Sequence, residues 1–172
     1  METYCIREAV AADAPAIHEL TIDGINSWAP DIYESLKPWV EATCSTEALA
    51  KKITGNDYTY FVCVDEEEKV IGTAYLNVGA RHMGGLYCGV KGRGMGTALM
   101  HKVFEVSSFY GLDHVACEIY EHNVPSISLM TKLGAVKYKS NPFDDVVYDE
   151  YHFSADVYNA YLQSSEQSAL VA

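Results

Sequence analysis

A glycine-rich segment between a strand-like run and a helix-like run constrains the fold more than any other feature. It reads Gly-Val-Lys-Gly-Arg-Gly-Met-Gly-Thr over residues 89–97. Glycine tolerates positive φ and lets the backbone approach a ligand closely. The free N–H groups and the dipole at the start of the following helix favour an anion. The segment therefore predicts a phosphate or pyrophosphate site, with added charge from Lys91 and Arg93. A turn with only a structural role is the alternative.

Spacing argues against two common nucleotide-binding motifs. The string GxxxxGK[ST] of P-loop proteins does not occur in the chain. The dinucleotide fingerprint GxGxxG has two residues between its second and third glycines and lies at the start of a βαβ unit. Residues 92–96 place glycine at every second position and follow several strands. Neither class of nucleotide-binding protein is favoured.

The order of helical and strand-like patterns predicts one mixed domain. A chain of 172 residues fits a single domain. Helical spacing predicts helices that begin at Asp13, which we expect to cap the first one, and near residues 31–40, 45–54, 97–110, 125–133 and 155–162. Aromatic and β-branched runs predict strands at residues 4–8, 58–64, 70–76, 83–88, 114–120, 135–139 and 146–153. We expect an α/β (α+β) domain over residues 1–163, built on one sheet, and a disordered tail over residues 164–172.

Composition narrows the partners and the compartment. The net charge is −12, from 24 acidic and 12 basic residues, which argues against nucleic acid and anionic membranes and would attract a cation. Solubility alone also explains such a charge. No run of about 18 apolar residues occurs, and residues 1–4 lack signal-peptide features, so we expect a cytoplasmic protein. The five cysteines include no CxxC pair, which predicts reduced thiols and no metal site.

Four stretches in one order carry a resemblance to a known family. Residues 91–96 resemble the signature [QR]-x-x-G-x-[GA], with Lys91 at the first position. Residues 123–135 resemble N-x-x-A-x-x-L-Y-x-x-x-G-F, residues 6–17 resemble an opening I-R-x-A…D-A-x-x-I, and residues 70–74 read V-I-G-T-A. Over about residues 4–153 the chain therefore resembles the GNAT superfamily of N-acetyltransferases.

The resemblance implies a fold, a donor and a set of contacts. The fold would be a GNAT-like single mixed sheet, mostly antiparallel and flanked by helices. Acetyl-CoA would donate its acetyl group directly to an amine, without a metal. The contacts implied are Leu86, Tyr87 and Cys88 along the pantetheine arm, Lys91, Gly92, Arg93, Gly94, Met95, Gly96 and Thr97 at the pyrophosphate, and Asn123 at the far end of the arm.

The chain departs from the family pattern at the catalytic positions. Met130 stands where the family often has a tyrosine acid, and a thioether has no proton to give. Tyr120, which shares a strand face with Glu118, is the candidate replacement, although a strand tyrosine also suits a core. In several family members a glutamate acts as the general base, and His82 stands at that position if the chain is aligned to the family with a gap. An alignment without the gap shifts the register of this strand by two residues. A polar hairpin end is the other interpretation of His82.

The sequence does not identify the acceptor substrate. A primary amine of a small molecule or of a protein fits the resemblance, and the acidic composition suggests a cationic one, with Asp144 and Asp145 as candidate contacts. A homodimer is a further partner that the sequence leaves open. An acetyl-CoA-binding regulatory module with lost or weak catalysis is the alternative that Met130 favours, and a donor other than acetyl-CoA is a third.

Overall fold

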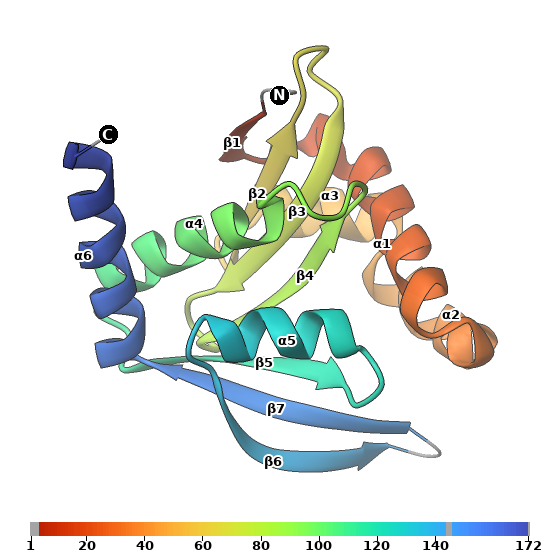
Figure 1. Ribbon diagram of the computed structural model, residues 1–172. Helices are drawn as coiled ribbons and strands as arrows, with labels where there is room; N and C mark the ends of the chain where they lie inside the picture. The colour runs from red at the N-terminus through yellow and green to blue at the C-terminus, as the bar shows by residue number, and fades with distance from the viewer. Residues whose placement is uncertain (1–3, 144–145, 172) are drawn as a thin grey trace.

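A computed structural model describes residues 4–143 and 146–171 of the chain (Figure 1). Its strands form one seven-stranded sheet in the order β1-β2-β3-β4-β5-β7-β6. The strands are β1 (Cys5–Glu8), β2 (Tyr58–Val64), β3 (Val70–Asn77), β4 (His82–Cys88), β5 (His114–Tyr120), β6 (Val136–Phe143) and β7 (Val146–Ser154). The helices are α1 (Ala14–Trp28), α2 (Tyr33–Thr43), α3 (Thr46–Thr54), α4 (Met95–Phe109), α5 (Val124–Lys132) and α6 (Ala155–Val171), with short 3₁₀ turns at Ala11–Asp13 and Pro30–Ile32. The expected single sheet flanked by helices is confirmed.

The sheet opens where β4 meets β5. These two strands are parallel, whereas every other neighbouring pair is antiparallel. Within the described residues they share a single register position, His82 opposite Ala116, and the Ala116 N–H donates to the Arg81 carbonyl at 2.8 Å. Beyond this point the strands fan apart into two half-sheets, β1–β4 and β5-β7-β6 (Figure 1).

A β-bulge explains the glycine pair in β4. Thr73 lies opposite Tyr87 and Tyr75 opposite Gly84, so β4 carries one more residue than β3 between the same two rungs. Gly85 has φ +60°, and a Cβ on Gly84 would lie 2.6 Å from the Tyr75 hydroxyl. Glycine is required here both for the backbone conformation and for the close approach of Tyr75.

Two hydrophobic clusters lie on opposite faces of the first half-sheet. Along β2, Phe61 and Cys63 join the larger cluster with α4, whereas Tyr60, Val62 and Val64 join the smaller one with α1 and α3. The larger cluster continues under the second half-sheet through Val115, Cys117 and Ile119 of β5, and reaches α5 and α6. The first half-sheet is therefore covered on both faces.

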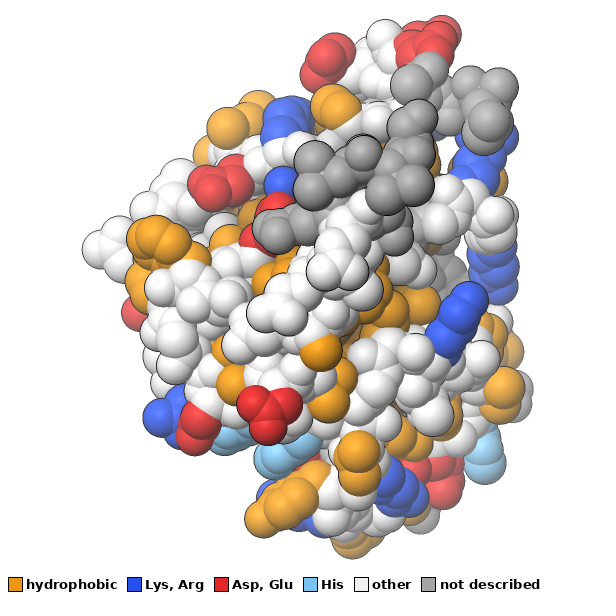
Figure 2. All heavy atoms as spheres, turned by 60° about the vertical axis from the view of Figure 1, so that its left-hand side comes forward, with side chains coloured by type: hydrophobic (Ala, Val, Ile, Leu, Met, Phe, Trp, Pro, Cys, Tyr) orange, Lys and Arg blue, Asp and Glu red, His pale blue; other side chains and the backbone are white. Residues whose placement is uncertain are grey.

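The C-terminal part of the chain differs from the expectation. A helix was expected over residues 155–162, and α6 runs further, to Val171. The helix is held at its base, since Tyr158 is fully buried against Phe104, with ring centroids 5.9 Å apart, and donates a hydrogen bond to the Leu112 carbonyl. On the face that presents α6, acidic side chains are scattered among basic and apolar ones (Figure 2). None of the described helices is long and apolar enough to cross a bilayer.

Two local expectations are also corrected. Asp13 does not cap α1 with its side chain, because its carboxylate accepts instead from the Val10 N–H at 2.8 Å and from Arg7 at 2.7 Å. Strand β6 runs to Phe143, through an expected loop that contains Pro142. Proline is tolerated there because β6 is an edge strand and has one neighbour only.

Candidate functional site

The glycine segment forms an open cradle at the start of α4. Gly92 and Gly94 have φ of +80° and +77°, and a Cβ on Gly92 would meet no heavy atom within 4 Å. Gly94 is the N-cap of α4 and supplies no side-chain cap, so the amides of the first turn have no side-chain acceptor. The cradle therefore offers outward N–H groups and a helix N-terminus to an anion.

A pocket of about 470 Å³ lies between this cradle, β4 and the N-terminus of α5. It brings together ten of the eleven residues that the sequence predicts at the donor site: Leu86, Tyr87, Cys88, Lys91, Gly92, Arg93, Gly94, Met95, Gly96 and Asn123. Thr97 is in the first turn of α4 and is not part of the lining. The remaining lining residues, missed by the sequence analysis, are Gly24, Ser27, Trp28, Val90, His122, Pro125, Ser126 and Leu129.

Two helix N-termini face the same pocket. The first is that of α4; the second is that of α5, where the Asn123 side chain accepts from the Ser126 N–H at 3.3 Å. Asn123 thus fixes the start of α5 as well as lining the pocket. Both termini favour negative charge, and the volume lies within the range of about 300–1,000 Å³ typical of ligand pockets. The residues present therefore fit a ligand that carries phosphates.

Helix α1 closes the pocket through a contact that no sequence signal indicates. A Cβ on Gly24 would lie 2.2 Å from Cδ1 of Tyr87, so only glycine lets α1 approach this ring. Burial raises the pKa of the Tyr87 phenol well above its usual range. Tyr87 is accordingly a neutral wall of the pocket and not a source of charge.

Neither of the two candidate catalytic residues lines the pocket. His82 is half-buried at the point where the half-sheets part, with its ring centroid 6.2 Å from that of Tyr75. Burial lowers the pKa of His82 below its ordinary value, against the opposing effect of Glu118 and Glu150. Its imidazole is therefore neutral at pH 7.

Tyr120 stands one layer behind the lining. Its ring centroid is 5.2 Å from that of Trp28 and 5.2 Å from that of His122, and both of those residues line the pocket. The register places Glu118 opposite Glu150 and Tyr120 opposite Tyr148, which agrees with the expectation that Glu118 and Tyr120 share a face.

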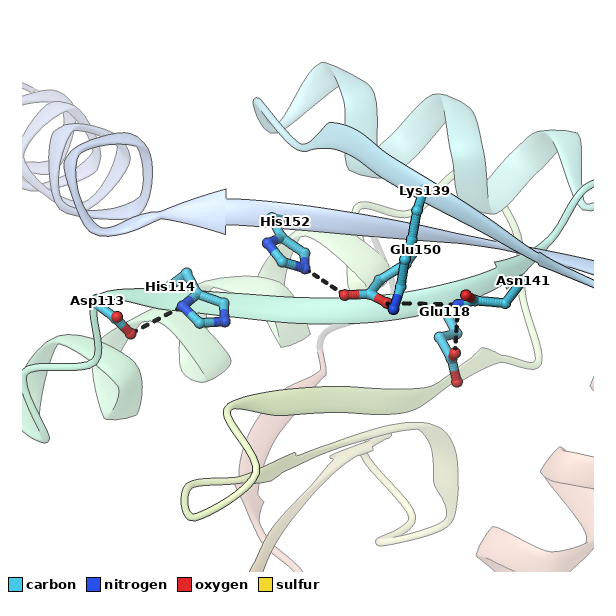
Figure 3. A network of polar contacts seen from close by, with 7 residues as sticks. All are labelled: Asp113, His114, Glu118, Lys139, Asn141, Glu150 and His152. Atoms are coloured by element: carbon cyan, nitrogen blue, oxygen red, sulfur yellow. Dashed lines mark hydrogen bonds and ion pairs between the residues drawn. The ribbon is translucent and has the colours of Figure 1, made fainter.

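A polar network ties the three strands of the second half-sheet together on that face (Figure 3). Asn141 of β6 donates to Glu118 at 3.1 Å and to Glu150 at 3.5 Å. Glu150 also contacts His152 at 2.6 Å and Lys139 at 3.2 Å. The hydrogen bond to His152 is the main reason that the pKa of Glu150 is lowered. The network holds two carboxylates on the side of the sheet where His82 lies.

Met130 and Asp149 do not line the pocket, and the two expected acceptor contacts cannot be placed. Met130 is 3% exposed, packs in the larger cluster and does not line the pocket. Asp149 is committed to Lys137 and Ser140, each at 2.7 Å. Asp144 and Asp145 lie outside the described residues. No group of three or more His, Cys, Asp or Glu side chains in the described part of the chain could hold a metal ion.

Comparison with known proteins decides the family. The model of the acetyltransferase (GNAT) family matches residues 23–135, about two thirds of the chain. The chain belongs to this family. It is therefore an acyltransferase, and the cradle at α4 is the segment that the family signature covers. No protein with a curated description matches the sequence.

Solved structures show the same GNAT fold at low identity. The PaiA N-acetyltransferase from Thermoplasma acidophilum in complex with coenzyme A has a TM-score of 0.74 and 17% identity over 88% of this chain and 99% of that one. The putative acetyltransferase YncA from Salmonella typhimurium with acetyl-CoA has a TM-score of 0.61 and 20% identity over 89% and 94%. The spermidine/spermine N-acetyltransferase SpeG from Vibrio cholerae has a TM-score of 0.67 and 15% identity over 92% and 97%.

Proposed function

We propose that this GNAT protein transfers the acetyl group of acetyl-CoA to a primary amine of a small molecule or a protein. One observation carries the proposal: a glycine-rich cradle at the start of α4 opens onto a pocket beside the diverging strands β4 and β5. Relatives of the same fold hold coenzyme A or acetyl-CoA. A pyrophosphate suits the cradle, and an extended arm suits the pocket behind it.

Each part of the pocket would bind one part of the donor. The amides of residues 91–97 and the charges of Lys91 and Arg93 would hold the pyrophosphate. The backbone of Leu86, Tyr87 and Cys88 would lie along the pantetheine arm, and Asn123 would contact it from α5. Acetyl-CoA supplies the reactive thioester, and the protein supplies position and exclusion of water.

His82 would take up the proton that the amine releases. An aliphatic amine is largely protonated at pH 7 and must be neutral to attack a thioester. The His82 imidazole is neutral because burial lowers its pKa, so it can accept a proton. Since His82 does not line the pocket, a chain of waters would carry the proton to it. Tyr120 would donate a proton toward the departing thiolate by the same route, through the Trp28 and His122 side of the pocket.

The acceptor that we propose is a small molecule whose amino group is protonated in solution. The net charge of −12 supports attraction of a protonated amine, and SpeG, which shares the fold, acts on spermidine and spermine. We further propose a cytoplasmic location, consistent with five free cysteines.

An acetyl-CoA-binding regulatory module is the second candidate. It is favoured by the burial of Met130 and by the absence of both His82 and Tyr120 from the described lining of the pocket. Thiol release from acetyl-CoA across a library of primary amines separates the two candidates. Release above the rate of buffer hydrolysis with one or more amines supports the enzyme. Calorimetric binding of acetyl-CoA without release for any amine identifies the module.

A further inference from the structure

A second cavity, of about 60 Å³, lies on the other side of Tyr87, between α1–α3 and the first half-sheet. The two spaces meet at the bulge of β4. Leu86 lines the donor pocket, Gly85 lines the second cavity and Tyr87 lines both. A group bound in the second cavity would therefore lie next to the strand along which the donor's arm is proposed to run.

The second cavity is lined by tyrosines that remain neutral. Tyr60, Tyr75 and Tyr87 all contribute to it, and burial raises the pKa of each phenol, that of Tyr75 to about 12. Tyr60 is 5% exposed, and its hydroxyl forms no hydrogen bond with any other described residue. The hydroxyl is therefore a donor that a group bound in the cavity could use.

The charge of the cavity is opposite to that of the protein. Among its described lining residues, Lys52 is the one side chain that carries a formal charge at neutral pH. Its Nζ donates to the Thr43 carbonyl at 2.8 Å and lies 5.4 Å from the Tyr58 ring centroid, and no described carboxylate lies within 4.0 Å of it. An ammonium has three N–H donors, so Lys52 retains donors for a ligand.

We infer that this cavity binds a carboxylate of the acceptor, so that the acceptor is an amino acid or a similar compound whose amine lies near a carboxylate. The inference rests on the proposed transferase function and narrows its substrate. Lys52 and the Tyr60 hydroxyl are both donors, and a carboxylate accepts only. A volume of about 60 Å³ is far below the roughly 300–1,000 Å³ typical of a pocket for a whole ligand, so the cavity suits one group of a ligand. A second ammonium, as in a polyamine, would meet the Lys52 charge instead.

The first test compares acceptors that differ only in charge. Each of the twenty L-amino acids is paired with its own primary amide, spermidine is added, and thiol release from acetyl-CoA is followed. We expect the best amino acid to exceed its amide by about tenfold or more in kcat/KM, the loss typical of a charged hydrogen bond. The amide has the less basic amine, so intrinsic reactivity works against this result. An equal or better amide, or spermidine as the best acceptor, overturns the inference and leaves the transferase intact.

The second test removes the charge with a matched control. Lys52→Met should raise KM for the amino acid about tenfold or more and leave KM for its amide nearly unchanged. Lys51→Met is the control, because Lys51 is the preceding residue of α3, is 77% exposed and pairs with Glu47 at 3.0 Å. An equal effect of Lys52→Met on acid and amide would show a structural role and contradict the inference.

The unpaired hydroxyl gives a further variant. Tyr60→Phe should raise KM for the amino acid several-fold without lowering Tm, since the hydroxyl has no described partner in the protein to lose. Tyr158→Phe, which loses a hydrogen bond to Leu112, should lower Tm instead. A Tyr60→Phe protein with reduced Tm and unaltered KM would count against the inference.

A binding measurement separates failure of the inference from failure of the transferase. The chain has two tryptophans, and Trp39 lines the second cavity. In a Trp28→Phe variant loaded with coenzyme A, Trp39 is the remaining tryptophan, and its fluorescence should change saturably when an amino acid is added. The matching amide should cause no change, and neither should the amino acid once Lys52→Met is also present. This readout needs no turnover. No response to any of the twenty amino acids overturns the inference, whereas thiol release decides the transferase.

Discussion

The two half-sheets are built differently, and the difference separates stability from chemistry. In the first, β2 reads Tyr-Thr-Tyr-Phe-Val-Cys-Val, and its residues feed clusters on both faces. In the second, β5 reads His-Val-Ala-Cys-Glu-Ile-Tyr, and only Val115, Cys117 and Ile119 are buried. The other face carries the polar network of Glu118 and Glu150. A continuous apolar strand indicates cover on two sides, and an alternating strand indicates cover on one.

The candidate site lies where these two environments meet. The covered half supplies the rigid parts, namely the bulge of β4, the start of α4 and the tyrosine-lined cavity. The open half supplies titratable groups near His82, which stands at the junction itself. Substitutions in the covered half should therefore act mainly on stability or binding, and those in the open half mainly on pH dependence.

The largest contrast is expected between Phe104 and Tyr138. Phe104 is fully buried between Phe153 and Tyr158, so Phe104→Ala should lower the free energy of unfolding by about 3–5 kcal/mol. Tyr138 is 66% exposed on β6, and Tyr138→Ala should stay within about 0.5 kcal/mol. Urea unfolding of both variants measures the contrast. Similar losses in both would mean that the second half-sheet is covered in solution.

Met130→Ala gives the next largest effect. Met130 is 3% exposed in the larger cluster, and a buried methionine truncated to alanine costs about 2–5 kcal/mol. We expect kcat to fall only in proportion to the folded fraction and its pH profile to keep its shape. Loss of the alkaline limb of that profile would show that position 130 acts on the proton after all.

The smallest effect is a pH dependence of stability from His82. Its pKa in the folded state lies below the ordinary value of about 6.5. Between these two values the unfolded chain binds more protons, so the free energy of unfolding rises with pH across that window and falls on acidification. His82→Gln should flatten this slope. Glu118→Gln removes a charge that raises the pKa of His82 and should steepen it; unchanged slopes in both variants would contradict the account.

Local pattern predicted much of this molecule. The strand His114–Tyr120 and the glycine segment before α4 follow from alternation and from backbone freedom, which are properties of neighbouring residues. Ten of the eleven residues predicted at the donor site also line one pocket, because most of them lie on one loop and the neighbouring strand; their contact with acetyl-CoA stays a prediction.

What the sequence left unresolved depends on contacts distant in the chain. Glycine is needed at residues 84 and 85 because Tyr75 packs across them. It is needed at residue 24 because Tyr87 packs against α1 there. The anchoring of α6 depends on Tyr158 packing on Phe104. The second cavity is lined by residues of α1, α2, α3, β2, β3 and β4, so no single segment of the sequence predicts it.

Calorimetry of acetyl-CoA binding to two glutamate variants tests the central claim most directly. Gly94 and Gly111 flank opposite ends of α4 and both have positive φ, +77° and +61°, so glutamate strains both backbones similarly. Only Gly94→Glu places a carboxylate in the cradle, where it would occupy the anion site. We predict that Gly94→Glu abolishes acetyl-CoA binding while Gly111→Glu binds like the unaltered protein. Binding of unaltered affinity by a folded Gly94→Glu protein would contradict the assignment of the donor site.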